Sequence, residues 1–146
     1  PASRGNVAIR SADPTDPPRI EPRYLSEDLD RKTLVAGIRT LREIYRQPAF
    51  RDLWDAEVLP GPGADTDRGL LDLAREHGGT VFHCVGTCRM GGDATAVVDP
   101  HLRVRGVERL RVIDASVMPV VTSANTNATS LMIGEKGAHL VLHGSP

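Results

Sequence analysis

The sequence predicts a mixed α/β fold in which short strands accompany longer helices. Two runs that alternate apolar and polar residues, residues 6–11 and 107–116, are typical of strands. Two stretches with apolar residues at helical spacing, residues 27–47 and 127–142, indicate amphipathic helices. At 146 residues the chain is long enough to bury a hydrophobic core.

The first fifty residues predict a strand, a proline-rich loop and a helix. After the strand at residues 6–11, the segment ADPTDPPRIEP contains four prolines, which forbid a regular helix. Ser26 can cap the helix that follows, and Glu27 and Asp28 suit its positive end. Pro48 marks the end of this helix, whose apolar stripe consists of Leu34, Ile38, Leu41 and Tyr45.

The middle of the chain predicts a loop, a shorter helix and a strand. Residues 59–63, LPGPG, are typical of a loop. A helix should begin at Thr66 or Asp67 and end at Gly78-Gly79, with Leu70, Leu73 and Ala74 as its apolar residues. Residues 80–87, TVFHCVGT, then predict a strand that enters a glycine-containing turn.

Two elements are expected in the last forty residues. Residues 107–116 should form a strand with Leu110 and Val112 on one face and a small, polar end at Asp114-Ala115-Ser116. The final helix should run from about Asn127 to Leu142, with Leu131, Ala138 and Leu142 along its apolar stripe.

Composition excludes several classes of function. The formal net charge is −1 with no basic stripe, so we do not expect nucleic-acid binding. No apolar run approaches the roughly 20 residues of a membrane helix. Cys84 and Cys88 are too few for a disulfide scaffold, and we expect two reduced, small, buried side chains in a cytoplasmic protein. Because the sequence starts at Pro1 rather than Met, we expect it to be a cut, processed or excerpted chain.

His83 is the strongest catalytic candidate among the five histidines. It lies at a predicted strand-to-turn junction beside Gly86 and Thr87, where small residues allow a ligand to approach. An imidazole can remove a proton from an alcohol near neutral pH. The alternative is an ordinary hydrogen-bonded histidine.

A metal site or a nucleophilic hydrolase site is not expected. His83, Cys84 and Cys88 lack the second Cys or His pair that zinc sites usually have, and a strand would point His83 and Cys84 to opposite faces. The sequence contains no G-x-S-x-G, G-x-G-x-x-G or G-x-x-x-x-G-K-[ST] motif.

Residues 123–130, SANTNATS, form a second candidate site. More cap-forming side chains gather here than one helix start needs. They could simply be a redundant N-cap. Alternatively, uncapped backbone N–H groups could face an anionic ligand such as the N1–C2=O edge of a reduced flavin, which the helix dipole would stabilise.

The segments HCVGTCRMG, AVVDPHLRVRGVERLRVIDASVMP and NTNATSLMIGEK resemble the carboxy-terminal signature of the glucose–methanol–choline (GMC) flavoprotein oxidoreductases. They are especially similar to the choline dehydrogenase-like branch. Upstream, SRGNVAIRSADP, PRIEPRYLS and GIRTLREIYRQPAF are also similar to it, so the resemblance covers nearly the whole chain.

This resemblance implies FAD-dependent oxidation of an alcohol, with hydride passing from the alcohol carbon to flavin N5. It assigns His83 as the base that takes the hydroxyl proton and Asn125 as the hydrogen-bonding partner of the substrate oxygen. The chain would be the carboxy-terminal part of a two-domain flavoenzyme. Residues 1–90 would belong to the substrate domain, and residues 91–146 would return to the FAD domain.

The resemblance also implies cofactor-binding residues in the returning segment. Asp114 and Ala115, at the end of a parallel strand, would lie near the FAD pyrophosphate and ribityl chain. Asn127 and Ala128, at the helix start, would face the pyrimidine edge of the flavin.

Two departures from the family pattern leave an alternative open. The strand, Gly-rich loop and helix that hold the ADP moiety in the family are absent, and no histidine matches the site of covalent flavin attachment. The expected partner is therefore an amino-terminal FAD-binding portion. The alternative is a non-catalytic, stand-alone fragment or a structural or binding domain without cofactor. The few aromatic residues do not complete a cage for choline, so the alcohol is not identified.

Overall fold

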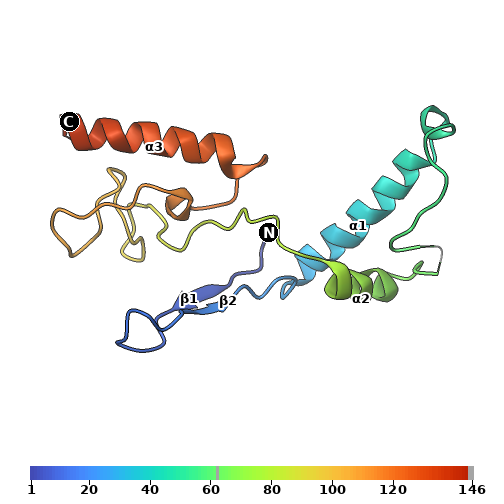
Figure 1. Cartoon of the computed structure of the whole chain (residues 1–146), viewed down its shortest axis with the longest axis horizontal. Coiled ribbons are helices and arrows are strands. Elements are labelled where there is room, and N and C mark those ends of the chain that lie inside the picture. The colour runs from blue at the N-terminus through green and yellow to red at the C-terminus, as the bar shows by residue number, and fades with distance from the viewer. Residues whose placement is uncertain (62, 145–146) are drawn as a thin grey trace. The chain divides into compact units, whose positions relative to one another are not determined.

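A computed structural model describes residues 1–61 and 63–144, and the chain divides into two compact units, Pro1–Gly79 and Thr80–Pro146 (Figure 1). The first unit contains a two-stranded sheet and two α-helices, and the second contains one long α-helix with irregular chain packed beneath it. The predicted mixed fold of helices and a small sheet is confirmed. In the described part of the chain, no helix combines the length and the apolar character that a membrane span requires.

The sheet is an antiparallel pair of β1, Asn6–Ala8, and β2, Arg19–Glu21, with Val7 opposite Ile20. The first strand falls inside the predicted range and is shorter. The second was not predicted, because the four surrounding prolines indicated a loop throughout. Three residues between Pro18 and Pro22 are enough to pair with β1, since proline lacks an N–H but does not prevent its neighbours from bonding.

Helix α1, Asp28–Tyr45, confirms the first predicted helix. The prediction that Ser26 caps it is wrong. Glu27 holds the N-cap position without a side-chain bond, and the backbone N–H of Ser26 donates to the Arg23 carbonyl, 3.3 Å away. Leu25 has a positive φ of 56°, so the chain makes a tight turn at Ser26 before the helix begins.

Helix α2, Asp67–His77, confirms the second predicted helix and its start. The Thr66 hydroxyl accepts a hydrogen bond from the Gly69 N–H at 3.0 Å, which is N-cap geometry. The predicted loop at residues 59–63 has no regular structure at its described positions, and Pro62 lies outside the described residues. Arg42 of α1 holds this loop. Its side chain is 10% exposed and bonds Glu57 at 2.8 Å and the Gly61 carbonyl at 3.3 Å.

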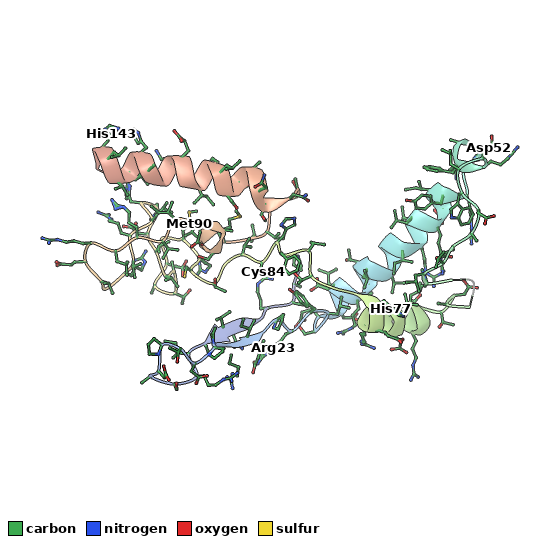
Figure 2. The ribbon with its side chains drawn as sticks, viewed as in Figure 1. Arg23, Asp52, His77, Cys84, Met90 and His143 are labelled. Atoms are coloured by element: carbon green, nitrogen blue, oxygen red, sulfur yellow. The ribbon has the colours of Figure 1, made fainter. Side chains whose placement is uncertain are left out.

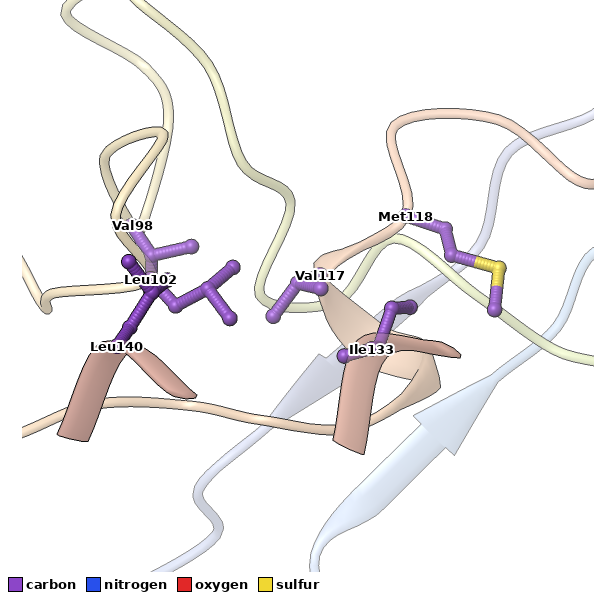
Figure 3. Close-up of a cluster of buried hydrophobic side chains, with 6 residues drawn as sticks. All are labelled: Val98, Leu102, Val117, Met118, Ile133 and Leu140. Carbon is purple, nitrogen blue, oxygen red and sulfur yellow. The ribbon is translucent and has the colours of Figure 1, made fainter. Parts of the chain in front are cut away.

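In the second unit, irregular chain packs against one face of α3, Thr126–His143. The buried side chains of this core come from three segments and include Val98, Leu102, Val117, Met118, Ile133 and Leu140 (Figure 3). Isolated bridges such as Met90–Val98 and Arg103–Arg111 hold the irregular segments together. A short 3₁₀ helix, η2, Ala115–Val117, contacts α3.

Both strands predicted for the second unit are wrong. In residues 80–87, Phe82 and Gly86 have φ values of +60° and +90°, which break an extended run. In residues 107–116, Arg109 has a φ of +61° and pairing is limited, among the described residues, to the isolated bridge at Arg111. The apolar alternation is present, but within residues 1–61 and 63–144 no neighbouring strand offers the consecutive partners that a ladder requires.

The last predicted helix is confirmed, but its predicted apolar stripe is wrong. Leu131 and Leu142 are 68% and 76% exposed, and Ala138 is also exposed. Ile133, Gly137 and Leu140 face the core instead. Because α3 is apolar on more than one side, its sequence pattern does not distinguish the face that packs within this unit.

Candidate functional site

The imidazole of His83 lies at the start of α3. Its Nδ1 is 2.9 Å from the Oγ1 of Thr126, the first residue of the helix. Thr126 is only 6% exposed and His83 is partly buried. One hydrogen bond therefore joins the two segments that the sequence singled out, 43 residues apart.

The segment that carries His83 is shaped by its backbone. Phe82 and Gly86 adopt left-handed conformations on either side of the histidine, at φ values of +60° and +90°. Further on, the Cys88 N–H donates to the Ser116 carbonyl at 3.0 Å and the Met90 N–H donates to the Val117 carbonyl at 2.8 Å. These bonds tie the histidine segment to η2, which packs against α3.

An ion pair closes the loop after this segment. The guanidinium of Arg89 bonds both carboxylate oxygens of Asp93, at 2.7 and 2.9 Å, and also contacts the Thr95 hydroxyl. The hydrogen bond from Arg89 and those from Thr95 hold the pKa of Asp93 well below its usual range. The loop is thus fixed by a carboxylate that stays ionised throughout the physiological range.

The N-terminus of α3 presents backbone donors without a side-chain cap. Asn125 holds the N-cap position, is exposed, and forms no capping bond in the part of the chain that the structure describes. Asn127 and Ala128, in the first turn, are exposed as well. A helix start with uncapped backbone N–H groups favours a negatively charged partner.

Asp114 and Ala115 lie at the start of η2 rather than at the end of a strand. One carboxylate oxygen of the exposed Asp114 accepts a hydrogen bond from the Ser116 N–H at 2.8 Å and so caps the 3₁₀ turn. Ala115 is partly buried. The expected parallel strand before them is absent from the described residues, but both belong to the same compact unit as His83 and Asn125.

The prediction that both cysteines are buried is wrong for Cys84. Cys84, labelled in Figure 2, is exposed and Cys88 is partly buried, and neither forms a disulfide bond within the described residues. The irregular chain around His83 leaves the Cys84 side chain exposed. The backbone N–H groups of Cys88 and Met90, further on, donate hydrogen bonds to carbonyls of η2. Residues 1–61 and 63–144 contain no group of three His, Cys, Asp or Glu side chains that could hold a metal ion.

Sequence reasoning missed Thr126 as a site residue. The hydroxyl was counted among several cap-forming side chains at the helix start, and the structure instead pairs it with the imidazole. The available signal was its position between Asn125 and Asn127, next to the predicted start of the helix. A helix begins here, so the side chain of residue 126 points to a different side from those of residues 125 and 127.

Comparison with known proteins gives consistent matches over the chain. The family model described as GMC oxidoreductase matches residues 1–134. An alcohol dehydrogenase [acceptor] of Pseudomonas putida is 44% identical over 142 residues, which are 97% of this chain and 26% of that enzyme. An oxygen-dependent choline dehydrogenase of Escherichia coli O127:H6 is 47% identical over 139 residues, which are 95% of this chain and 25% of that enzyme.

A solved structure agrees with these relatives. The formate oxidase of Aspergillus oryzae RIB40, studied for modification of its FAD, superposes with a TM-score of 0.88 at 33% identity. The match covers 97% of this chain and 25% of the oxidase. The chain thus spans about a quarter of the length of the relatives it matches. Since the family model covers most of the sequence, the chain belongs to the GMC oxidoreductase family.

Proposed function

We propose that this chain is the carboxy-terminal catalytic part of an FAD-dependent oxidoreductase that oxidises an alcohol. The observation that carries the proposal is the hydrogen bond between His83 and Thr126, which brings an imidazole to the start of a helix with free N–H groups. Family membership supports the redox chemistry, and a relative named alcohol dehydrogenase supports the substrate class.

In this proposal His83 is the general base. The alcohol loses its hydroxyl proton to the imidazole as its carbon loses a hydride, so that the C–O single bond becomes a carbonyl. FAD, when bound, supplies the hydride acceptor at N5. Because His83 is held through Nδ1, its Nε2 is the nitrogen proposed to take the proton.

Asn125 is proposed to hydrogen-bond the substrate oxygen and fix its orientation. Its carboxamide is exposed and is not used to cap α3. A neutral amide can both donate and accept, which suits an oxygen that passes from hydroxyl to carbonyl. Asn125 and Thr126 are adjacent in sequence, so the orienting group and the base are held by the same helix start.

The remaining assigned residues would hold the cofactor. The first turn of α3 at Asn127 and Ala128 suits the pyrimidine edge of the flavin, and Asp114 with Ala115 would line the pyrophosphate and ribityl region. We assign residues 1–90 to the substrate domain and 91–146 to the FAD domain. An amino-terminal FAD-binding portion of the enzyme is the proposed partner, and the cytoplasm is the proposed location.

A stopped-flow measurement of flavin reduction by alcohol without oxygen tests the base. The chain is assayed together with the FAD-binding part of the enzyme. We expect His83→Ala to slow reduction by about 100- to 10,000-fold, the usual contribution of a general base. His77→Ala, at the exposed end of α2, is the matched control and should reduce flavin at the normal rate. Near-normal reduction by His83→Ala would rule out the proposed role.

The same assay tests the orienting residue. We expect Asn125→Ala to lower the rate of reduction by about 10- to 100-fold, because a misaligned alcohol reaches the reactive geometry less often. FAD binding should be unchanged, since the carboxamide is assigned to the substrate. A variant that loses FAD but reduces normally once saturated would place Asn125 at the cofactor instead.

A further inference from the structure

We propose that Thr126 is a positioning residue for His83. Its hydroxyl accepts a hydrogen bond from Nδ1–H of the imidazole, which leaves the lone pair of Nε2 available for the alcohol proton. The inference rests on the proposed function of His83 as base and adds the residue that sets its tautomer and orientation.

The contact has the geometry and the burial of a specific interaction. The distance from Thr126 Oγ1 to His83 Nδ1 is 2.9 Å, and Thr126 is 6% exposed, the one buried polar or charged residue among those described. A buried hydroxyl needs a partner because water cannot reach it, and its partner here is the imidazole.

The two partners differ in how firmly the fold holds them. Thr126 begins an 18-residue helix whose Ile133 and Leu140 are buried in the core, and a β-branched side chain has few rotamers. The Thr126 carbonyl also accepts a hydrogen bond from the Ser130 hydroxyl at 2.8 Å. His83 lies on an irregular segment between two left-handed residues. The hydroxyl is therefore the fixed point and the imidazole is the group that it orients.

The direction of the hydrogen bond decides the chemistry. If the hydroxyl donated to Nδ1, the ring hydrogen would lie on Nε2 and that nitrogen could not accept a proton. If Nδ1–H donates to the hydroxyl, Nε2 is a free base. After Nε2 takes the alcohol proton, both nitrogens carry hydrogen and Nδ1–H still donates to Oγ1. The same contact thus serves the ring before and after proton transfer.

The test compares Thr126→Val with Thr126→Ser in the assembled enzyme. Valine keeps the shape of threonine and removes the acceptor, so flavin reduction should slow by about 10- to 100-fold with little change in KM. Serine keeps the hydroxyl and should retain most of the rate. Thr33→Val is the matched control, because the Thr33 hydroxyl bonds the Leu29 carbonyl within α1 at 2.8 Å. It should behave as the unaltered enzyme.

A spectroscopic measurement reports the tautomer directly. In enzyme labelled with ¹⁵N-histidine, with the His83 signals assigned by their loss in His83→Ala, Nδ1 should carry the hydrogen. In Thr126→Val the hydrogen should shift toward Nε2. A purely structural role for Thr126 would not move the hydrogen from one nitrogen to the other.

Three results would overturn the proposal. These are a hydrogen on Nε2 in the unaltered enzyme, a normal rate in Thr126→Val, or an equal loss in the serine and valine variants, which would show that keeping the hydroxyl does not keep the rate. Should Thr126→Val fail to fold, the nitrogen signals of the unaltered enzyme decide. Failure of the underlying function is distinguishable, because His83→Ala would then reduce flavin normally.

Discussion

A single carboxylate of α1 holds the amino-terminal segment of the first unit. The two oxygens of Asp30 accept hydrogen bonds from the backbone N–H groups of Ala2 and Ser3, at 2.8 and 2.7 Å. The Ser3 hydroxyl and these two N–H groups lower the pKa of Asp30 from 3.8 to about 2. The segment that leads into β1 is thereby attached to the first turn of α1.

This attachment should depend on pH in a predictable direction. Because the pKa of Asp30 is lower in the folded chain than in the unfolded chain, its stabilising contribution is complete above the ordinary value of 3.8. It is lost as the pH falls toward about 2. We expect the amide signals of Ala2 and Ser3 to titrate together in this range by NMR, and Asp30→Asn to abolish that titration. Asp52→Asn, at an exposed position, should leave both signals unchanged. Amides that titrate equally in Asp30→Asn would contradict the assignment.

At the residue scale, sequence and resemblance named the candidates, and the structure supplied the contact between their segments. His83 and the helix start around Asn125 were expected from their local patterns. The bond from His83 to Thr126 was not, because 43 residues separate the partners and no local periodicity connects them. The exposure of Cys84 was missed for a related reason. The alternation of apolar and polar residues predicted a strand here, and it does not reveal the positive φ values of Phe82 and Gly86.

At the level of elements, α3 approaches Ile113 closely at Gly137. A Cβ at Gly137 would overlap the Ile113 side chain, whereas a Cβ at Gly134 would meet nothing within 4 Å. Both glycines lie within the same helix, so they have the same cost in backbone entropy. The difference between them isolates the contribution of the contact with Ile113.

Alanine substitutions at these two glycines should therefore have opposite effects. Gly137→Ala should destabilise the protein by about 1–3 kcal/mol, because the methyl group forces the helix away from Ile113. Gly134→Ala should stabilise it by about 0.5–1 kcal/mol through a better helix propensity. Denaturant unfolding followed by circular dichroism measures both. Equal effects of the two substitutions would show that Ile113 does not limit the approach of the helix.

Helices were predicted better than strands, for a physical reason. The backbone hydrogen bonds of α1, α2 and α3 form within each helix segment. Apolar periodicity and caps such as Thr66 therefore predict the helices from local sequence. A strand is defined by a neighbour. The alternating residues 107–116 have no continuous partner among the described residues and form an isolated bridge and η2 instead. The short β2 was missed because its partner β1, not its own composition, makes it a strand.

On the scale of the whole molecule, the second unit carries large apolar side chains that are exposed. On α3, Leu131 and Leu142 are 68% and 76% exposed, and Val120, in the segment before the helix, is 65% exposed. Side chains of this size are usually buried, and exposed apolar faces mark interaction surfaces. The relatives that the chain matches are about four times as long, which agrees with a proposal in which further polypeptide covers these faces.

The same reasoning predicts how the isolated chain should treat FAD. In the proposed site the start of α3 faces the flavin edge, but the sequence contains no Gly-rich loop for the pyrophosphate. We expect the chain alone to bind FAD weakly or not at all in a titration followed by flavin fluorescence. Addition of the FAD-binding part of the enzyme should produce tight binding, and His83→Ala should bind equally well because the imidazole is assigned to the proton and not to the cofactor. Tight binding of FAD by the 146 residues alone would mean that the chain holds the adenosine and phosphate groups through contacts other than a nucleotide-binding loop.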